Sequence, residues 1–135
     1  MSGVRVLLAD DHPAMLDHLV KLLERHFDVV GTVCDGQALV DAVAVTNPNV
    51  IVSDISMPIL SGLEAVNQLK AKGSTAKIVF FTVHEDPDYI SAALDAGVDC
   101  YVVKSRLAAD LVTAIRKALK GQHFVSPSVR PNRHL

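Results

Sequence analysis

Acidic residues stand at the ends of two short apolar runs in this chain of 135 residues. Leu8-Ala9 leads into Asp10-Asp11, and Val50-Ile51-Val52-Ser53 leads into Asp54. Burying a carboxylate is costly unless a cation or hydrogen-bond donors compensate for the lost water. Two apolar segments that both end in carboxylates therefore indicate a chemical site at this end of the segments.

The acidic residues are suited to holding a divalent cation. Three carboxylates that lie close together repel one another unless a cation binds between them. Carboxylate and carbonyl oxygens are the ligands that Mg²⁺ prefers, and the ion keeps positions open for phosphate oxygens. We expect Asp10, Asp11 and Asp54 to hold Mg²⁺ together with the backbone carbonyl of Ser56.

Phosphoryl transfer is the chemistry that such a site would support. It needs a nucleophile in line with phosphorus, a cation on the phosphoryl oxygens and further donors to these oxygens. Asp54 is the candidate nucleophile and phosphorylation site, because an aspartyl carboxylate can form a covalent acyl phosphate. Thr82 and Lys104 stand at the ends of two later apolar runs and would bind phosphate through a hydroxyl and an ammonium group.

Five apolar runs of strand length alternate with amphipathic segments along the chain. Strands are expected at residues 4–9, 29–34, 50–53, 77–82 and 100–103. The segments between them have apolar residues at helical spacing, such as Leu16, Leu19 and Leu23 in the first. Gly97 and Gly121 follow the fourth and fifth of these segments and suit helix ends.

This alternation predicts a flavodoxin-like, doubly wound α/β fold of the (βα)5 type. Its parallel five-stranded sheet would have the order 2-1-3-4-5, with right-handed crossovers. Ligands bind such folds beyond the carboxyl ends of the strands, where the strand order reverses. The candidate residues, which are Asp10, Asp11, Asp54, Thr82 and Lys104, would all lie on that rim.

The composition fits one domain and gives no general argument for nucleic acid or membrane binding. Half of the residues are apolar, and the formal net charge is -2. The apolar runs are far shorter than the ~20 residues of a membrane helix, so no membrane association is expected. Cys34 and Cys100 are interpreted as small buried residues without a disulfide, which fits a cytoplasmic location.

Together these residues resemble the receiver domain of two-component response regulators. The resemblance extends from Val4 to Gly121. It rests on Asp10-Asp11, on Asp54 followed by Met57-Pro58 and Gly62, on Thr82, and on Tyr101-Val102-Val103-Lys104. It implies Mg²⁺-dependent transfer of a phosphoryl group from a histidine kinase to Asp54. It also implies a phosphoacceptor that assists its own phosphorylation and dephosphorylation and is not a conventional enzyme.

The resemblance further implies a conformational switch. The Thr82 hydroxyl would move to the phosphoryl group while Tyr101 turns inward, and the change would reach the face of the fourth helix, fifth strand and fifth helix. Dimer contacts between two copies could then change on phosphorylation. Ser56 and His84 would flank the path of the hydrolytic water and Val83 would narrow access to the phosphate, so all three would modulate dephosphorylation. The other histidines are expected to lie on the surface.

The end of the chain resembles one branch of the family. Lys104 is followed by Ser105 where receivers commonly have proline, and residues 121–127 are similar to the join between a NarL/FixJ-type receiver and its LuxR-type helix-turn-helix domain. We therefore expect a receiver at residues 1–121 and a tail or linker at residues 122–135. DNA would be reached only through an output domain outside this sequence, and both an excised and a stand-alone receiver remain open.

Other interpretations of the same residues are open. A phosphohydrolase of the haloacid dehalogenase type would have a second Asp two residues after the nucleophile, where this chain has Ser56. A receiver-like module that acts only by protein–protein interaction would not need the full set of site residues. Asp11 could cap the first helix, and Tyr101 could be a packing residue on an edge strand.

Overall fold

The computed structural model describes residues 3–82 and 87–126, with the backbone alone for residues 87–90. In this part of the chain strands and helices alternate, and the ten elements that the sequence predicts are all present. The strands are β1 (Arg5–Ala9), β2 (Asp28–Val33), β3 (Val50–Asp54), β4 (Lys77–Thr82), β5 (Cys100–Val103) and β6 (Phe124–Val125). The helices are α1 (Pro13–Leu23), α2 (Gly36–Thr46), α3 (Gly62–Ala71), α4 (Pro87–Asp95) and α5 (Leu107–Leu119), and a short 3₁₀ turn, η1 (Lys104–Arg106), joins β5 to α5.

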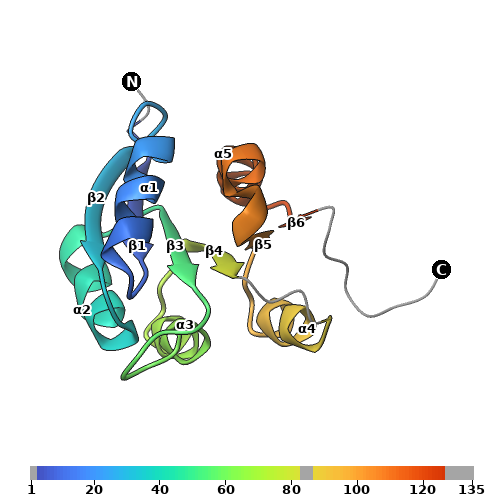
Figure 1. Cartoon of the computed structure of the whole chain (residues 1–135). Coiled ribbons are helices and arrows are strands. Elements are labelled where there is room, and N and C mark those ends of the chain that lie inside the picture. Colours follow the sequence, from blue (N-terminus) through green and yellow to red (C-terminus); the bar gives the residue numbers. More distant parts are fainter. Residues whose placement is uncertain (1–2, 83–86, 127–135) are drawn as a thin grey trace.

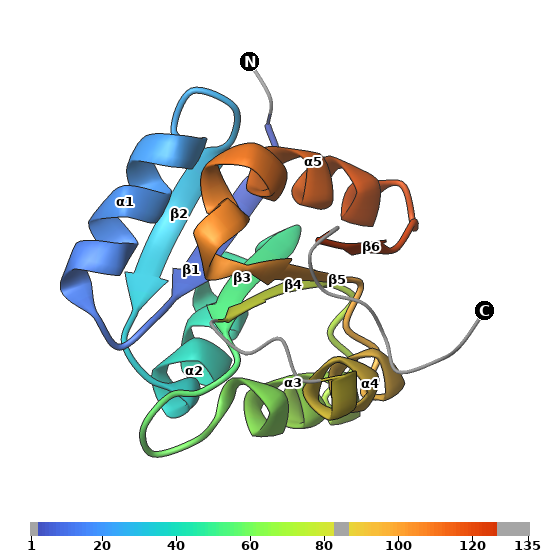
Figure 2. The ribbon, with the colours of Figure 1, turned by 45° about the vertical axis from the view of Figure 1, so that its right-hand side comes forward.

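The sheet is parallel and has the order β2-β1-β3-β4-β5-β6. Its first five strands confirm the predicted flavodoxin-like order. Helices α1 and α5 cover one face, and α2, α3 and α4 cover the other (Figures 1 and 2). The order reverses between β1 and β3, so the space beyond their carboxyl ends is the position that this topology offers for a ligand.

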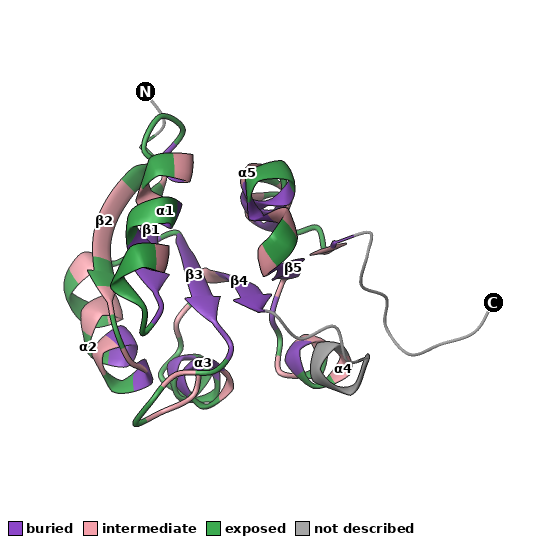
Figure 3. Ribbon diagram, viewed as in Figure 1, coloured by how far each residue is buried: buried purple, intermediate pink, exposed green. Residues whose placement is uncertain are grey.

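Alternate residues of the central strands face two separate cores. In β1, Val6 and Leu8 pack with α1 and α5, whereas Leu7 and Ala9 pack with α2 and α3. Figure 3 shows the buried residues of β3 and β4 in the middle of the sheet. A central sheet buried on both faces holds its strand ends rigidly, which is what a site built on those ends requires.

Local sequence determines where the helices begin and end. Ser61 and Glu64 form a capping box before α3, in which each side chain accepts the other residue's backbone N–H at 3.1 Å. Gly97 and Gly121 have φ angles of +91° and +75°, a conformation that glycine adopts without strain. Their predicted role at helix ends is therefore confirmed.

Two features differ from the expectations. Strand β6 adds a sixth strand parallel to β5, so β5 is not an edge strand in the described part of the chain. Cys34 is exposed, because it follows the half-buried edge strand β2, and its predicted burial is wrong, whereas Cys100 is buried.

Both thiols are free, and the Lys104–Ser105 peptide bond is trans. No helix in the described residues has the length and apolar character needed to cross a membrane.

Candidate phosphoacceptor site

Asp10 lies directly after β1 and is fully buried. Its Oδ1 accepts a hydrogen bond from the backbone N–H of His12 at 2.8 Å. Among the described residues, Oδ2 has no hydrogen-bond partner, although Lys104 Nζ lies 3.7 Å away. A buried carboxylate oxygen without a donor is costly. A cation bound against Oδ2 would remove that cost.

Asp54 is the last residue of β3 and only 5% of it is exposed. Its Oδ1 accepts the backbone N–H of Ser56 at 3.1 Å, and its Oδ2 accepts a hydrogen bond from Lys104 Nζ at 3.1 Å. Burial raises the pKa of Asp54 above its ordinary value, because lost solvation outweighs the two donors. The fold therefore holds this carboxylate in an environment that disfavours its charge.

Lys104 connects the two buried carboxylates. It follows β5 directly, and the pairing of Val103 with Thr82 brings it beside the end of β4. Its ammonium also lies 5.5 Å from the centre of the Phe81 ring, a cation–π contact. Asp10, Asp54 and Lys104 are separated by tens of residues in sequence, and the ends of β1, β3 and β5 bring them together as predicted.

Asp11 and His12 extend the site toward solvent. Nδ1 of His12 lies 3.1 Å from Asp10 Oδ1 and 3.0 Å from Asp11 Oδ1, and potential ligand atoms of these three residues lie within 4.8 Å of one another. His12 is exposed, as predicted, but its contacts with the acidic pair were not predicted, although its position directly after that pair was a usable signal. The N-cap of α1 is His12, so Asp11 is not the cap of that helix.

These residues fit a hard divalent cation. Carboxylate oxygens dominate the set, and the unpartnered Oδ2 of Asp10 is directed toward the side of the site that holds Lys104 and Asp54. Oxygen ligands of this kind suit Mg²⁺. The donor chemistry is therefore consistent with the predicted ion.

The loop after β3 is held close to Asp54 by its backbone. Gly62 N–H donates to the Ile55 carbonyl at 2.9 Å, and a Cβ atom at Gly62 would overlap the carbonyl oxygen of Asp54. A glycine is needed because α3 starts directly against the end of β3. This approach fixes the loop that contains Ser56, whose N–H reaches the Asp54 carboxylate.

The remaining predicted residues lie in three different situations. Thr82 is buried at the end of β4, on the same rim as Asp54. Tyr101 is fully buried in β5, in the core beneath α4, and β6 flanks its strand. Val83 and His84 lie outside the residues that the structure describes.

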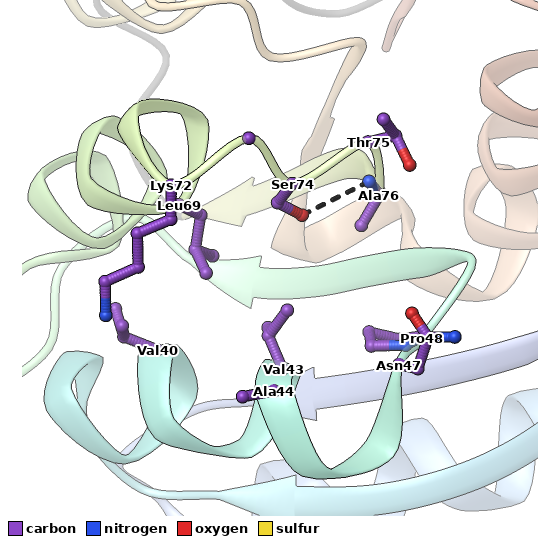
Figure 4. A pocket seen from close by; sticks show the side chains of 11 residues that line it. Val40, Val43, Ala44, Asn47, Pro48, Leu69, Lys72, Ser74, Thr75 and Ala76 are labelled. Carbon is purple, nitrogen blue, oxygen red and sulfur yellow. Dashed lines mark hydrogen bonds between the residues drawn. The ribbon is translucent and has the colours of Figure 1, made fainter.

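A separate pocket lies at the opposite end of the sheet (Figure 4). Its volume is about 340 Å³, with Val40 and Val43 of α2 on one side and Leu69, Lys72 and residues 73–76 on the other. Its loops precede β3 and β4, so it opens at their amino ends, away from Asp10 and Asp54. This pocket takes no part in the carboxylate site.

Comparisons with known proteins agree with this geometry. The family described as response regulator receiver domain matches residues 6–116. The transcriptional regulatory protein YvfU of Bacillus subtilis is 34% identical over 131 residues, covering 96% of this chain and 66% of the relative. The nitrate/nitrite response regulator NarL of Escherichia coli is 30% identical over 128 residues, covering 93% of this chain and 59% of NarL. The chain spans between 56% and 66% of the length of three such curated relatives.

Solved structures agree in the same way. A LuxR-family two-component response regulator from an Aurantimonas species matches with a TM-score of 0.90 and 32% identity, over 95% of this chain and 93% of that one. The isolated receiver domain of RcsB from Salmonella enterica serovar Typhimurium, solved with a phosphomimetic beryllium fluoride, matches with a TM-score of 0.87 and 30% identity, over 95% of this chain and 96% of that one. The chain therefore belongs to the response regulator receiver domain family, among regulators of the NarL and LuxR type.

Proposed function

We propose that the chain receives a phosphoryl group on Asp54 from a phosphohistidine of a histidine kinase, in a reaction that requires Mg²⁺. The observation that carries this proposal is the contact of 3.1 Å between Lys104 Nζ and Asp54 Oδ2, with the buried Asp10 on the same rim. An acceptor carboxylate needs a fixed cation next to it to compensate the charge of the incoming phosphoryl group. Family membership supports the same chemistry.

Asp54 acts as the nucleophile in this proposal. One of its carboxylate oxygens attacks phosphorus, the P–N bond of the phosphohistidine breaks, and the electron pair of that bond leaves with the imidazole nitrogen. Lys104 then binds a phosphoryl oxygen instead of the free carboxylate, and the Thr82 hydroxyl donates to another. The product is an acyl phosphate that acts as a signal, so the chain is a phosphoacceptor and not a turnover enzyme.

Asp10, Asp11, Asp54 and the Ser56 carbonyl would hold Mg²⁺. When bound, the ion neutralises charge on the phosphoryl oxygens and orients them for in-line attack. The unpartnered Oδ2 of Asp10 supports this assignment, because it is a buried oxygen acceptor whose hydrogen-bonding capacity is otherwise unused.

The output of the phosphorylated state would be a change in contacts with other molecules. Thr82 and Tyr101 are the proposed switch residues, and Tyr101 lies in the core on the side of α4. We extend the proposal to dimer formation on phosphorylation and to control of transcription in the cytoplasm through an output domain beyond residues 122–135. Several relatives are transcriptional regulators, and one neighbouring structure holds RcsB dimers bound to DNA.

The influence of three residues on the lifetime of the phosphoryl group remains a prediction. Ser56 lies next to Asp54 and is exposed, whereas Val83 and His84 lie outside the described residues. We retain the proposal that these three side chains modulate hydrolysis of the acyl phosphate.

Labelling with a small phosphodonor tests the proposed function. The purified chain would be incubated with acetyl phosphate and followed by intact mass, with Mg²⁺ or with excess chelator. We expect one phosphoryl group per chain with Mg²⁺, almost none with chelator, and none in Asp54→Asn. Equal labelling of Asp54→Asn and the wild type would refute the proposal.

A further inference from the structure

A buried polar cluster joins the end of the described chain to the start of α5. Both Asp110 and Ser126 are buried, with Ser126 fully inaccessible. The Ser126 hydroxyl donates to Asp110 Oδ2 at 2.8 Å and accepts the backbone N–H of Val103 at 3.1 Å. Arg106 donates to the same carboxylate from Nε at 2.7 Å and from a terminal nitrogen at 3.1 Å. We call these four residues the Asp110 cluster.

Every carboxylate oxygen of Asp110 has a partner. Burial by itself would raise the pKa of Asp110, but the hydrogen bonds from Arg106 and Ser126 lower it below its ordinary value. The carboxylate is therefore ionised and bound at neutral pH. Buried polar networks of this kind hold their members in one arrangement, because breaking a single bond leaves a buried group unpaired.

The Asp110 cluster contacts the chain on both sides of Lys104, through the backbone of Val103 and the side chain of Arg106. Val103 precedes Lys104 and donates its N–H to Ser126, and Arg106 ends the turn η1 that begins at Lys104. Ser126 therefore bonds directly to Val103, the residue before Lys104. Through Asp110 it is also connected to Arg106, the last residue of η1. Ser126 is in turn held by its own N–H, which donates to the Tyr101 carbonyl at 3.1 Å.

The position of Lys104 matters because its side chain reaches across the rim to two carboxylates. Its Nζ lies 3.1 Å from Asp54 Oδ2 and 3.7 Å from Asp10 Oδ2, so a small rotation of η1 would move the ammonium out of hydrogen-bond range of Asp54. Figures 1 and 2 show β6 beside β5 at the edge of the sheet, next to α5. Displacements of about 1 Å in a reacting group can change rates by large factors.

We propose that Asp110 and Ser126 are positioning residues for Lys104, and that the segment ending in Ser126 is coupled through them to the phosphoryl group on Asp54. This inference rests on the proposed function. Coupling between two sites is reciprocal, so binding of a phosphoryl group by Lys104 also strengthens the attachment of Ser126. The chain beyond Ser126 thus begins at a residue that responds to phosphorylation.

Two serines provide a matched test. Ser126→Ala removes the hydroxyl of the cluster, Ser126→Thr keeps a hydroxyl, and Ser105→Ala removes an exposed hydroxyl from the same turn. We would measure the maximal rate of labelling by acetyl phosphate with saturating Mg²⁺, and Mg²⁺ affinity by titration calorimetry. We expect Ser126→Ala to label about 10-fold more slowly with Mg²⁺ affinity no weaker than wild type, since only Lys104 is displaced. Ser126→Thr should regain most of the rate, and Ser105→Ala should match the wild type.

Hydrogen exchange supplies a second readout on the wild-type chain. Mg²⁺ with beryllium fluoride, a mimic of the phosphoryl group, should slow exchange of the Val103 and Ser126 amides, and Lys104→Met should abolish this slowing. This readout decides the question if Ser126→Ala does not fold. Equal labelling rates for Ser126→Ala and Ser105→Ala, or no change in exchange, would overturn the inference. A wild-type chain that accepts no phosphoryl group would instead overturn the proposed function.

Discussion

At the scale of single residues, the site places the buried carboxylate of Asp54 next to the ammonium group of Lys104. This cation compensates only part of the free-energy cost of burying the negative charge. Asp54 is buried and its pKa is raised by lost solvation, although Ser56 and Lys104 both donate to it. Such an arrangement lowers the stability of the fold, because it keeps a reactive group in an unfavourable environment. A divalent cation would reduce the repulsion between the carboxylates on this rim. It should therefore bind there favourably.

The raised pKa of Asp54 gives a stability prediction with a definite sign. Because its folded pKa lies above its unfolded pKa, its stabilising effect is complete below the unfolded pKa and is lost as pH rises through the folded pKa. Asp54→Asn mimics the protonated form at every pH. We expect the variant to match the wild type below about pH 4 and to be more stable than the wild type at neutral pH. Urea unfolding without Mg²⁺ measures this difference.

Asp110→Asn is the control of opposite sign. The pKa of Asp110 is lowered in the fold, so its contribution is present above the unfolded pKa and is lost as pH falls through the folded pKa. The variant should be less stable than wild type at neutral pH, with the deficit shrinking in acid. A neutral-pH destabilisation of Asp54→Asn comparable to that of Asp110→Asn would contradict the electrostatic description of both groups.

At the scale of elements, the site depends on how closely α3 approaches the end of β3. Gly62 is the first residue of α3, and its N–H and missing side chain allow that contact. The capping box of Ser61 and Glu64 begins the helix at this residue. A glycine is therefore needed because the backbone of Asp54 lies so close to it, and not because the residue adopts a special backbone angle.

Gly62→Ala should destabilise the chain by about 1–3 kcal/mol, because a Cβ atom would overlap the backbone of Asp54 and force the loop outward. Urea unfolding provides the measurement. Gly31→Ala is the matched control, since its Cβ would meet the movable end of the Leu7 side chain at 3.2 Å, and its cost should be smaller. Equal stabilities of the two variants would show that the approach of α3 to β3 is not tight.

Sequence patterns predicted those elements whose signals are local. The apolar runs of β1, β3 and β4 and the glycines after α4 and α5 gave the architecture and the rim to within a residue or two. Strand β6 has only two residues, and it forms only because β5 lies beside it. No apolar periodicity in the sequence therefore predicts it. Asp110 and Ser126 are 16 residues apart and meet only through that pairing, which is why the cluster was not predicted.

At the scale of the whole molecule, the sheet separates two cores and gathers chemistry at one end. Strand ends from β1, β3, β4 and β5 supply Asp10, Asp54, Thr82 and Lys104, so the site exists only when these four strands have paired. Hydrogen bonds through Val103 and Asp110 connect this rim to the last described residue, Ser126.

Chemical mapping of the acceptor tests the central claim most directly. Borohydride reduces an acyl phosphate to an alcohol, so the acceptor aspartate becomes homoserine and its peptide changes mass. After incubation with acetyl phosphate and Mg²⁺, we predict homoserine at the position of Asp54 and at no other aspartate. Homoserine at Asp10 or Asp11, or at no position in a folded and Mg²⁺-loaded chain, would contradict the assignment of Asp54 as the phosphoacceptor.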